Sequence, residues 1–447
     1  MELLSALPAS LSRWIRHLVC LLDCRTAPRL AAHFFGLLLA SGRRTVTSWF
    51  RPAGITDDFR PAYHAVYACG KNTDACALVL LYDVLRPLWQ SLPRLVFALD
   101  DTPTPRYGPC VEGAGLHHNP TPGPSNAPYV YGHIWVTLAL LANHPLWGTL
   151  ALPLLARLYV RRKDIDSLPP NYAWPFRTKL ELAGELLAWL RQWLGNKGKP
   201  VWLVADGGYA KKPFLQEARR LKVTVVSRLR KDAALWTLPP EERPAGKRGP
   251  KPKYGNRRID LKKRAGQPGG WQTVACVQYG KQQAKRIKTF LATWRPAGGV
   301  IRVVLVREED GWLPFFCTDV EATAAEVLTA MADRGAIELA FREVKEVWGA
   351  GQQQLRNLYA NVGAFHMNLW AMTMVEAAAW DRPDEELVDR EASPWDSEPR
   401  RPSHADKRKV LQREILEKEI EAAIRPTAET PDFQEVVKRL FHLARGC

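Results

Sequence analysis

The stretch RLVFALDD, residues 94–101, joins an apolar run to two carboxylates. Every residue from Leu95 to Leu99 is apolar, which predicts a short strand buried on both faces of a sheet. Asp100 and Asp101 follow at the end of that strand. Acidic residues in this position are typical of turns and helix caps, and also of sites that bind a cation at a sheet edge.

The segments that follow alternate between strand and helix patterns. The expected strands are 94–101, 129–142, 147–162, 200–210 and 223–230, and the expected helices are 179–196 and 212–222. Only NHPL, residues 143–146, separates the second and third strands, which predicts a hairpin. Gly195 is the expected end of the longer helix, whose apolar face is made of Leu182, Leu186, Trp189 and Trp193. This order of elements predicts an α/β fold.

The rest of the chain divides into regions by composition. GRRTVTSWFRPAGI, residues 42–55, lies in a mostly helical region and carries Arg43 and Arg44 in a basic turn. It fits a helical DNA-binding domain as well as an ordinary helical packing domain. The expected regions are a helical DNA-binding domain at 1–92, the first part of the core at 93–234, a basic loop with a β-strand insertion at 235–320, the final core helices at 321–380, and a linker with a helical tail at 381–447.

The charge of the chain points to a polyanionic partner. Its 63 Lys and Arg residues exceed its 46 Asp and Glu residues, which gives a formal net charge of +17. Double-stranded DNA is the expected partner, and an anionic membrane surface is the alternative, although we find no long basic amphipathic helix. Because no uncharged stretch reaches the ~18 apolar residues of a membrane span, we expect a cytoplasmic protein without a membrane partner.

The densest cationic segment lies in the expected insertion. Residues 239–264, PPEERPAGKRGPKPKYGNRRIDLKKR, are rich in Pro, Gly, Lys and Arg and poor in apolar residues, so we expect a basic loop. Arg248, Lys251 and Lys253 are its candidates for contacts with DNA phosphates or the minor groove. The alternative is a basic loop with no fixed role.

A late helix carries a further acidic candidate. In DRGAIELAFREVKEVWGAG, residues 333–351, the expected buried stripe consists of Ile337, Phe341, Val344 and Trp348. Arg334, Glu338 and Lys345 form a file beside that stripe, because each residue turns the helix by about 100°. Such a file is either a solvated face or one wall of a site.

The acidic candidates can meet at one edge of the sheet. Asp206 ends the strand at 200–210, and strand ends converge where open α/β folds bind their ligands. A helix packed by its apolar stripe could bring Glu338 to the same edge. Clustered carboxylates repel one another, and divalent cations remove that cost. Mg²⁺ prefers such oxygen ligands, and two ions about 3.5–4 Å apart can promote reactions of a phosphodiester.

Three blocks of the sequence, ALDDTPTPRYG, VADGGYAKKPF and DRGAIELAFREVKEVWGAG, resemble the catalytic blocks of bacterial insertion-sequence transposases with an RNase H-like DDE domain. The likeness is closest to the group with a β-strand insertion before the last acid. The tyrosine–arginine–glutamate–lysine signature of that group is matched by Arg334, Glu338 and Lys345, while Met331 stands at the tyrosine position. The resemblance covers roughly residues 95–357.

The resemblance implies an RNase H-like mixed sheet flanked by helices, with a β-rich insertion and a helical N-terminal domain. The implied catalytic acids and metal ligands are Asp101, Asp206 and Glu338, with Asp100 as a neighbour or substitute of the first acid. These acids would hold two Mg²⁺ ions, or Mn²⁺ in their place, while Arg334 and Lys345 would bind DNA phosphates. The implied activity is cut-and-paste DNA cleavage and strand transfer at terminal inverted repeats, performed by a homodimer.

Two other functions stay open at this point. An RNase H-fold nuclease would cleave DNA without joining it to a target. A domesticated, inactive DNA-binding protein would do neither, although such a module has no use for clustered carboxylates beside phosphates.

Overall fold

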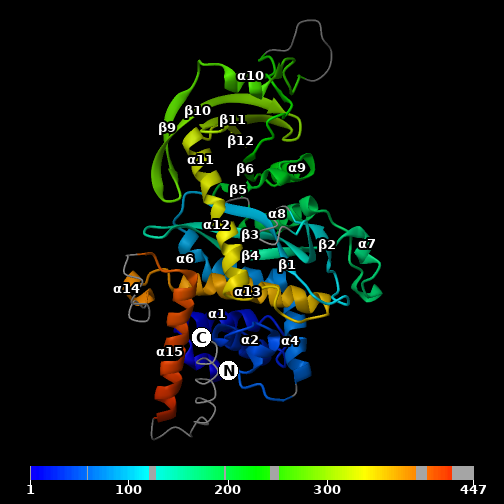
Figure 1. The fold of residues 1–447 in the computed structure, drawn as a ribbon, viewed down its shortest axis with the longest axis vertical. Helices are drawn as coiled ribbons and strands as arrows, with labels where there is room; N and C mark the ends of the chain where they lie inside the picture. Colours follow the sequence, from blue (N-terminus) through cyan, green and yellow to red (C-terminus); the bar gives the residue numbers. More distant parts are fainter. Residues whose placement is uncertain are drawn as a thin grey trace.

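The computed structural model describes residues 2–57, 59–119, 127–195, 198–241, 251–388 and 400–424. A mixed sheet runs through this part of the chain, with helices packed against it (Figure 1). In that view the N-terminal helices lie below the central strands and the insertion strands lie above them. The expected α/β fold, with helices flanking a sheet, is confirmed.

The sheet has 12 strands in the described residues. They are β1 (Leu95–Pro105), β2 (Gly115–His118), β3 (Tyr129–His144), β4 (Gly148–Tyr159), β5 (Val201–Ala205), β6 (Thr224–Arg228), β7 (Leu235–Trp236), β8 (Arg258–Ile259), β9 (Gln272–Gln278), β10 (Lys281–Trp294), β11 (Gly299–Glu308) and β12 (Gly311–Cys317). The main path runs β2-β3-β1-β5-β6-β12-β11-β10-β7-β8. Because β1, β5 and β6 are parallel, their carboxyl ends lie at one edge of the sheet.

The insertion strands β9 to β12 pair antiparallel, as the alternating sequence predicts. They continue the core sheet, because β12 pairs with β6 at Cys317 and Val226. The prediction of a loop across 239–264 is wrong at its end, where β8 is followed by the short helix α10. Asp260 begins that helix by accepting a hydrogen bond from the Lys263 amide.

Helices cover the sheet and form the lower part of the molecule in Figure 1. The α-helices are α1 (Ala9–Val19), α2 (Ala27–Leu39), α3 (Val46–Phe50), α4 (Phe59–Lys71), α5 (Thr73–Val79), α6 (Arg86–Trp89), α7 (Arg162–Ile165), α8 (Lys179–Leu194), α9 (Lys212–Arg220), α10 (Leu261–Gly266), α11 (Ala324–Asp333), α12 (Gly335–Glu346), α13 (Leu358–Ala378), α14 (Asp384–Leu387) and α15 (His404–Ile424). Short helices of other types are η1 (Glu2–Ala6), η2 (Leu80–Val84), η4 (Pro170–Tyr172) and η5 (Gly207–Tyr209).

Helix α8 follows the prediction except at its last turn. Thr178 and Glu181 form a capping box at its start, and Gly195 ends it with a φ of 68°. Trp193, which was expected on the apolar face, is 40% exposed. The other three residues of that face are buried.

The N-terminal helices pack closely on α13. A Cβ atom added to Gly70 of α4 would lie 1.8 Å from the carbonyl oxygen of Tyr359, and one added to Gly363 of α13 would lie 2.0 Å from that of Val66. The two helices therefore cross with their backbones in contact, which only glycine permits. The buried side chains of α1 to α4 and of α13 belong to one continuous core.

Helix α15 joins three parts of the molecule through buried charges. Arg408 donates hydrogen bonds to carbonyls at the end of α2, including Leu37 and Leu38 at 3.2 Å each, and to Val347 at the end of α12 at 3.0 Å. These are carbonyls that a helix leaves without a partner. Burial lowers the pKa of Arg408 to about 9, so the guanidinium stays charged at neutral pH.

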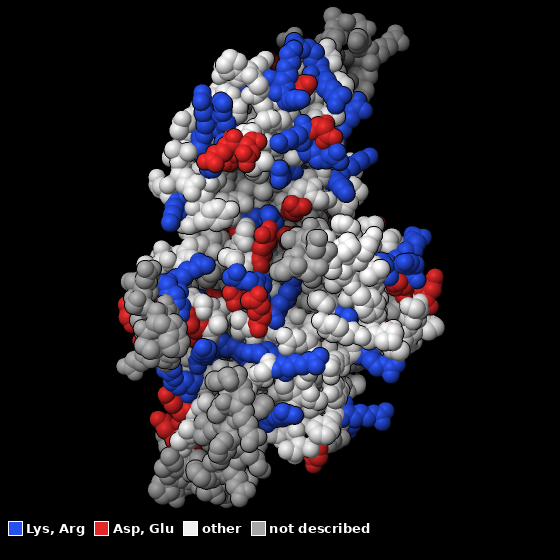
Figure 2. All heavy atoms as spheres, in the orientation of Figure 1, with Lys and Arg blue, Asp and Glu red and all other residues white. Residues whose placement is uncertain are grey.

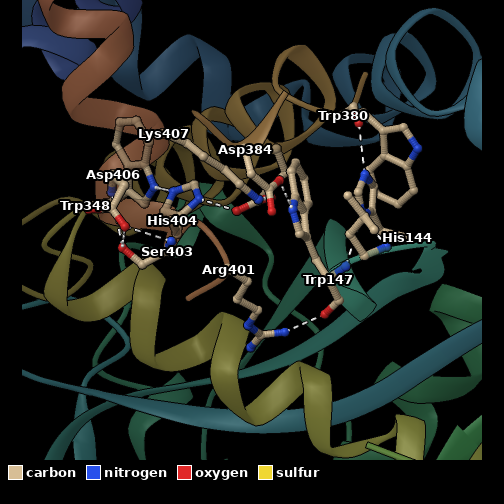
Figure 3. Close-up of polar contacts among 12 residues, drawn as sticks. His144, Trp147, Trp348, Trp380, Asp384, Arg401, Ser403, His404, Asp406 and Lys407 are labelled. Carbon is tan, nitrogen blue, oxygen red and sulfur yellow. Dashed lines mark hydrogen bonds and ion pairs between the residues drawn. The ribbon is translucent and has the colours of Figure 1, made fainter. Parts of the chain in front are cut away.

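A second buried network joins His404 and Lys407 of α15 to Glu376 of α13. Figure 3 shows His404, Lys407 and Trp348 of this network. Glu376 accepts hydrogen bonds from Lys407 at 2.5 Å and from His404 Nδ1 at 2.6 Å. The indole of Trp348 donates to His404 Nε2 at 2.6 Å, so Nε2 is the accepting nitrogen and Nδ1 carries the proton. Burial would raise the pKa of Glu376, but His404 and Lys407 outweigh it and lower the pKa to about 2.

Candidate active site

Asp100 and Asp206 lie next to one another where the pairing of β1 with β5 ends. In the parallel pair of β1 and β5, Leu99 is level with Ala205. The next residue of each chain segment is therefore Asp100 on one side and Asp206 on the other. Since successive side chains of a strand point to opposite faces, Asp100 and Asp101 of β1 lie on opposite faces, and the charge of Asp206 acts on Asp100.

Asp100 is held by the helix that carries Glu338. Arg334 Nη1 donates to Asp100 Oδ2 at 2.7 Å, and the Asp101 amide donates to Asp100 Oδ1 at 2.8 Å. The Asp100 side chain is only 18% exposed. Burial raises its pKa to about 6, the nearby charges of Asp101 and Asp206 add to the rise, and Arg334 opposes it.

Asp101 has a different set of partners. Lys179 donates to Asp101 Oδ2 at 2.5 Å and the Tyr209 hydroxyl donates to Oδ1 at 2.9 Å. Burial, followed by the charge of Asp101, raises the pKa of Tyr209 well above its ordinary value, so this phenol keeps its proton. Both oxygens of Asp101 are thus bound within the chain.

Asp206 begins the short helix η5. Its Oδ2 accepts a hydrogen bond from the Gly208 amide at 3.0 Å, which is the capping role expected of an aspartate after a strand. The residue is exposed, and its charge is felt by Asp100 and by Arg334. A capping role and a place in the acidic cluster therefore coexist.

Glu338 meets this cluster through Arg334. Arg334 Nη2 donates to Glu338 Oε1 at 2.7 Å, one helical turn away, so one guanidinium spans Asp100 and Glu338. The Glu338 side chain is 60% exposed. The stripe expected to seat this helix, made of Ile337, Phe341, Val344 and Trp348, is buried as predicted.

The donor set suits a hard divalent cation. Carboxylate oxygens are the ligands that Mg²⁺ prefers. Burial, and to a smaller extent the charges of Asp101 and Asp206, raise the pKa of Asp100, and a bound cation would lower it. Within the described residues, no three His, Cys, Asp or Glu side chains are already arranged to hold an ion. Instead, Arg334 and Lys179 are bound to Asp100, Glu338 and Asp101.

The other candidate cations are spread over the molecule. Lys345 is half-buried, and burial lowers its pKa. Arg43 is exposed, whereas Arg44 is half-buried and its amide donates to the side chain of Gln352 at 2.8 Å. None of these contacts brings Lys345, Arg43 or Arg44 to the acidic candidates.

In the insertion, the two described cations of the predicted set are exposed. Lys251 donates a hydrogen bond to the Glu241 carbonyl, and the Lys251 and Lys253 side chains are both exposed. Arg248 lies outside the described residues.

Two partners of the acids escaped the sequence analysis. Lys179 is the first residue of α8, and nothing in its spacing marks it as a neighbour of Asp101. Tyr209 stands in the DGGY block, three residues after Asp206, so that block contained a signal for it. Both are found only through the pairing of β1 with β5 and the packing of α8.

Carboxylates on neighbouring strands of an α/β sheet, with an arginine and a glutamate of a helix beside them, suit metal-assisted chemistry on a phosphodiester. The chain belongs to the DDE superfamily endonucleases, whose family model matches residues 17–297. It is therefore a nuclease-type enzyme of a family that acts on DNA and generally uses divalent metal ions. The matched segment contains Asp100, Asp101 and Asp206 and ends before Glu338.

No curated protein matches the chain. Among the helices of the described residues, none has both the length and the apolar character needed to cross a bilayer.

Proposed function

We propose that the protein is a DNA transposase that cleaves at terminal inverted repeats and joins the freed end to a target. The observation that supports this proposal is that Arg334 binds both Asp100 and Glu338, while the charge of Asp206 acts on Asp100 and on Arg334. A single guanidinium brings the acid of the first strand and the acid of the late helix together, although 234 residues separate Arg334 from Asp100.

Asp100, Asp206 and Glu338 are the proposed ligands of two Mg²⁺ ions, or of Mn²⁺ in their place. When bound there, such ions would supply charge neutralisation at a phosphate and activation of a hydroxyl group. Asp101 was the expected first acid, but we assign that role to Asp100, because Arg334 links Asp100 to Glu338 and both oxygens of Asp101 are bound elsewhere. Asp101 then orients Lys179 and Tyr209 on the other face of the strand.

The remaining residues would position the DNA. Arg334 has five N–H donors in a planar fork, so it can release a carboxylate and hold a phosphate oxygen in its place. Lys345, three turns along α12 from Arg334, adds a point charge on the same helix. Pairing two element ends would bring two copies of the chain together, which is why we propose a homodimer in the complex with DNA.

The experiment incubates the full chain with labelled duplexes that carry the DNA flanking its own gene, with Mg²⁺, Mn²⁺ or a chelator, and with a target plasmid. Metal-dependent cleavage followed by joined products is the expected result. Cleavage without joined products would replace the proposal by a nuclease without strand transfer, and binding alone would replace it by an inactive DNA-binding protein. Asp206→Asn is the control, expected to bind DNA and not to cut it.

A further inference from the structure

A groove lies next to the turn that carries Asp206. Its volume is about 490 Å³, and its wall begins at Gly207 and Ala210, directly after that acid. Arg228 at the carboxyl end of β6 forms the next part of the wall. The far side comes from Trp236 and from the turn at 294–296 in the insertion. The groove therefore leads from the acidic cluster to the insertion.

The charges of this groove are strongly unequal. Its cations are Lys211, Arg228, Arg230 and Arg295, and its acid is Asp232. Arg230 and Asp232 form an ion pair at 2.8 Å, so these two charges cancel. Among the described residues, no carboxylate lies within ion-pair distance of the three remaining cations. All three are exposed.

Aromatic rings hold one of these cations in place. The Arg295 guanidinium lies 5.7 Å from the ring centre of Trp236 and 5.8 Å from that of Tyr254. Such stacking restricts the side chain and leaves its N–H donors free for an anion. Tyr254 follows Lys251 and Lys253 in the sequence. Its contact with Arg295 therefore brings this part of the basic segment to the groove.

The cationic surface continues into the insertion. A second cavity of about 700 Å³ shares Asp232 and Ala233 with the first. Its cations are Lys231, Arg258 and Lys262, and its acids are Asp232 and Asp260. Figure 2 also has Lys and Arg side chains gathered over the insertion. The cations extend along two adjoining cavities, which suits a polyanion with regularly spaced phosphates. A single phosphate would need only one group of cations.

We propose that this groove binds the phosphate backbone of duplex DNA that leaves the acidic cluster toward the insertion. The statement that the reacting bond lies at Asp206 and its neighbours rests on the proposed function. The statement that the groove binds DNA rests on the charge and shape of the groove. The repeating phosphates of DNA match the strung cations, and an acidic polypeptide is the competing occupant that the test must separate.

The test compares the full chain with the variant K211Q/R228Q/R295Q in binding a labelled duplex at several salt concentrations. Each lost phosphate contact lowers the slope of log affinity against log salt by about 0.9, so three contacts lower it by about 2.7. If the affinities at 1 M salt are equal, this corresponds at about 0.1 M salt to a loss of nearly three powers of ten in affinity. The matched control, R86Q/K163Q/K222Q, removes three exposed cations from elements that do not line the groove.

A groove variant with the salt slope of the unaltered chain would overturn the inference, and so would an equal loss in the control. Greater loss of binding to polyglutamate than to DNA would overturn it in favour of an acidic protein partner. If the triple variant melts early, the single variants R228Q and R295Q are each expected to lower the slope by about 0.9.

Failure of the groove and failure of the proposed function give different results. Cleavage by the unaltered chain together with an unchanged slope in the groove variant refutes the groove alone. A reduced slope in the groove variant, with no metal-dependent cutting by the unaltered chain, supports the groove and refutes the proposed function alone.

Discussion

Arg334 and Asp100 form an ion pair at 2.7 Å between the start of the late helix α12 and the middle of the first strand. The second nitrogen of the same guanidinium binds Glu338 at the same distance. The ion pair thus fixes where the last acid lies relative to the first. Asp101, although next in sequence, makes its contacts with α8 and η5.

This difference between neighbours predicts unequal effects of two conservative changes. Asp100→Asn should lower the rate of DNA cleavage by more than about 100-fold, the upper range for loss of a supporting group around a metal. Asp101→Asn should lower it less, because its carboxylate is already bound to Lys179 and Tyr209. Single-turnover cleavage measures both, and unaltered DNA binding is the control. The opposite order of effects would return the role of first acid to Asp101.

Removing Arg334 should shift the pH dependence of cleavage. Burial raises the pKa of Asp100 to about 6 and Arg334 holds it down, so Arg334→Gln raises the pKa further. A larger fraction of Asp100 is then protonated at neutral pH and cannot act as a ligand. The acidic limb of the pH–rate profile should move to higher pH in the variant. An acidic limb at the same pH in both proteins would show that Asp100 does not control it.

The buried Glu376 should make the protein sensitive to acid. Its pKa is lowered to about 2 from 4.5, so its contribution of about 3 kcal/mol is present above pH 4.5 and lost as the pH falls toward 2. Glu376→Gln leaves Lys407 buried without its partner and should cost about 3–5 kcal/mol at neutral pH. Urea unfolding at neutral and acidic pH measures both. The variant should lose less stability on acidification, and an equal loss would contradict the assignment.

The crossing of α4 and α13 predicts a steric effect of one methyl group. Gly363→Ala would put a Cβ atom 2.0 Å from the Val66 carbonyl oxygen, so the helices must move apart. The expected cost is at least about 1–3 kcal/mol, measured by thermal or urea unfolding. Gly266→Ala is the matched control, because nothing lies within 4 Å of the added atom. Equal stability of both variants would mean that the crossing adapts freely.

Local patterns in the sequence predicted most of the elements near the site. The apolar run before Asp100, the hairpin around NHPL and the stripe of Ile337, Phe341, Val344 and Trp348 each follow from periodicity within one segment. Thr323 and Glu326 form a capping box at the start of α11, and a threonine followed three residues later by a glutamate is the sequence pattern of such a box. These features depend on neighbours in sequence, so one chain suffices to find them.

Contacts between distant segments could not be predicted in the same way. Whether Asp100 or Asp101 faces Asp206 depends on the register of two strands about 105 residues apart, and a shift by one residue exchanges their faces. The partners Lys179 and Arg408 carry no local signal, because each acts on a segment far away in the chain. The insertion was recognised as β-rich, but its pairing with β6 depends on tertiary packing.

Arg408 has a consequence for engineering the protein. Its side chain binds the ends of α2 and α12 together, so the N-terminal helices, the glutamate-bearing helix and the C-terminal helix form a single mechanical unit. A chimera that takes residues 1–92 from a relative would have to bring the end of its α2 within reach of Arg408. Exchange of the first helices between relatives should therefore be tolerated best when α15 is transplanted along with them.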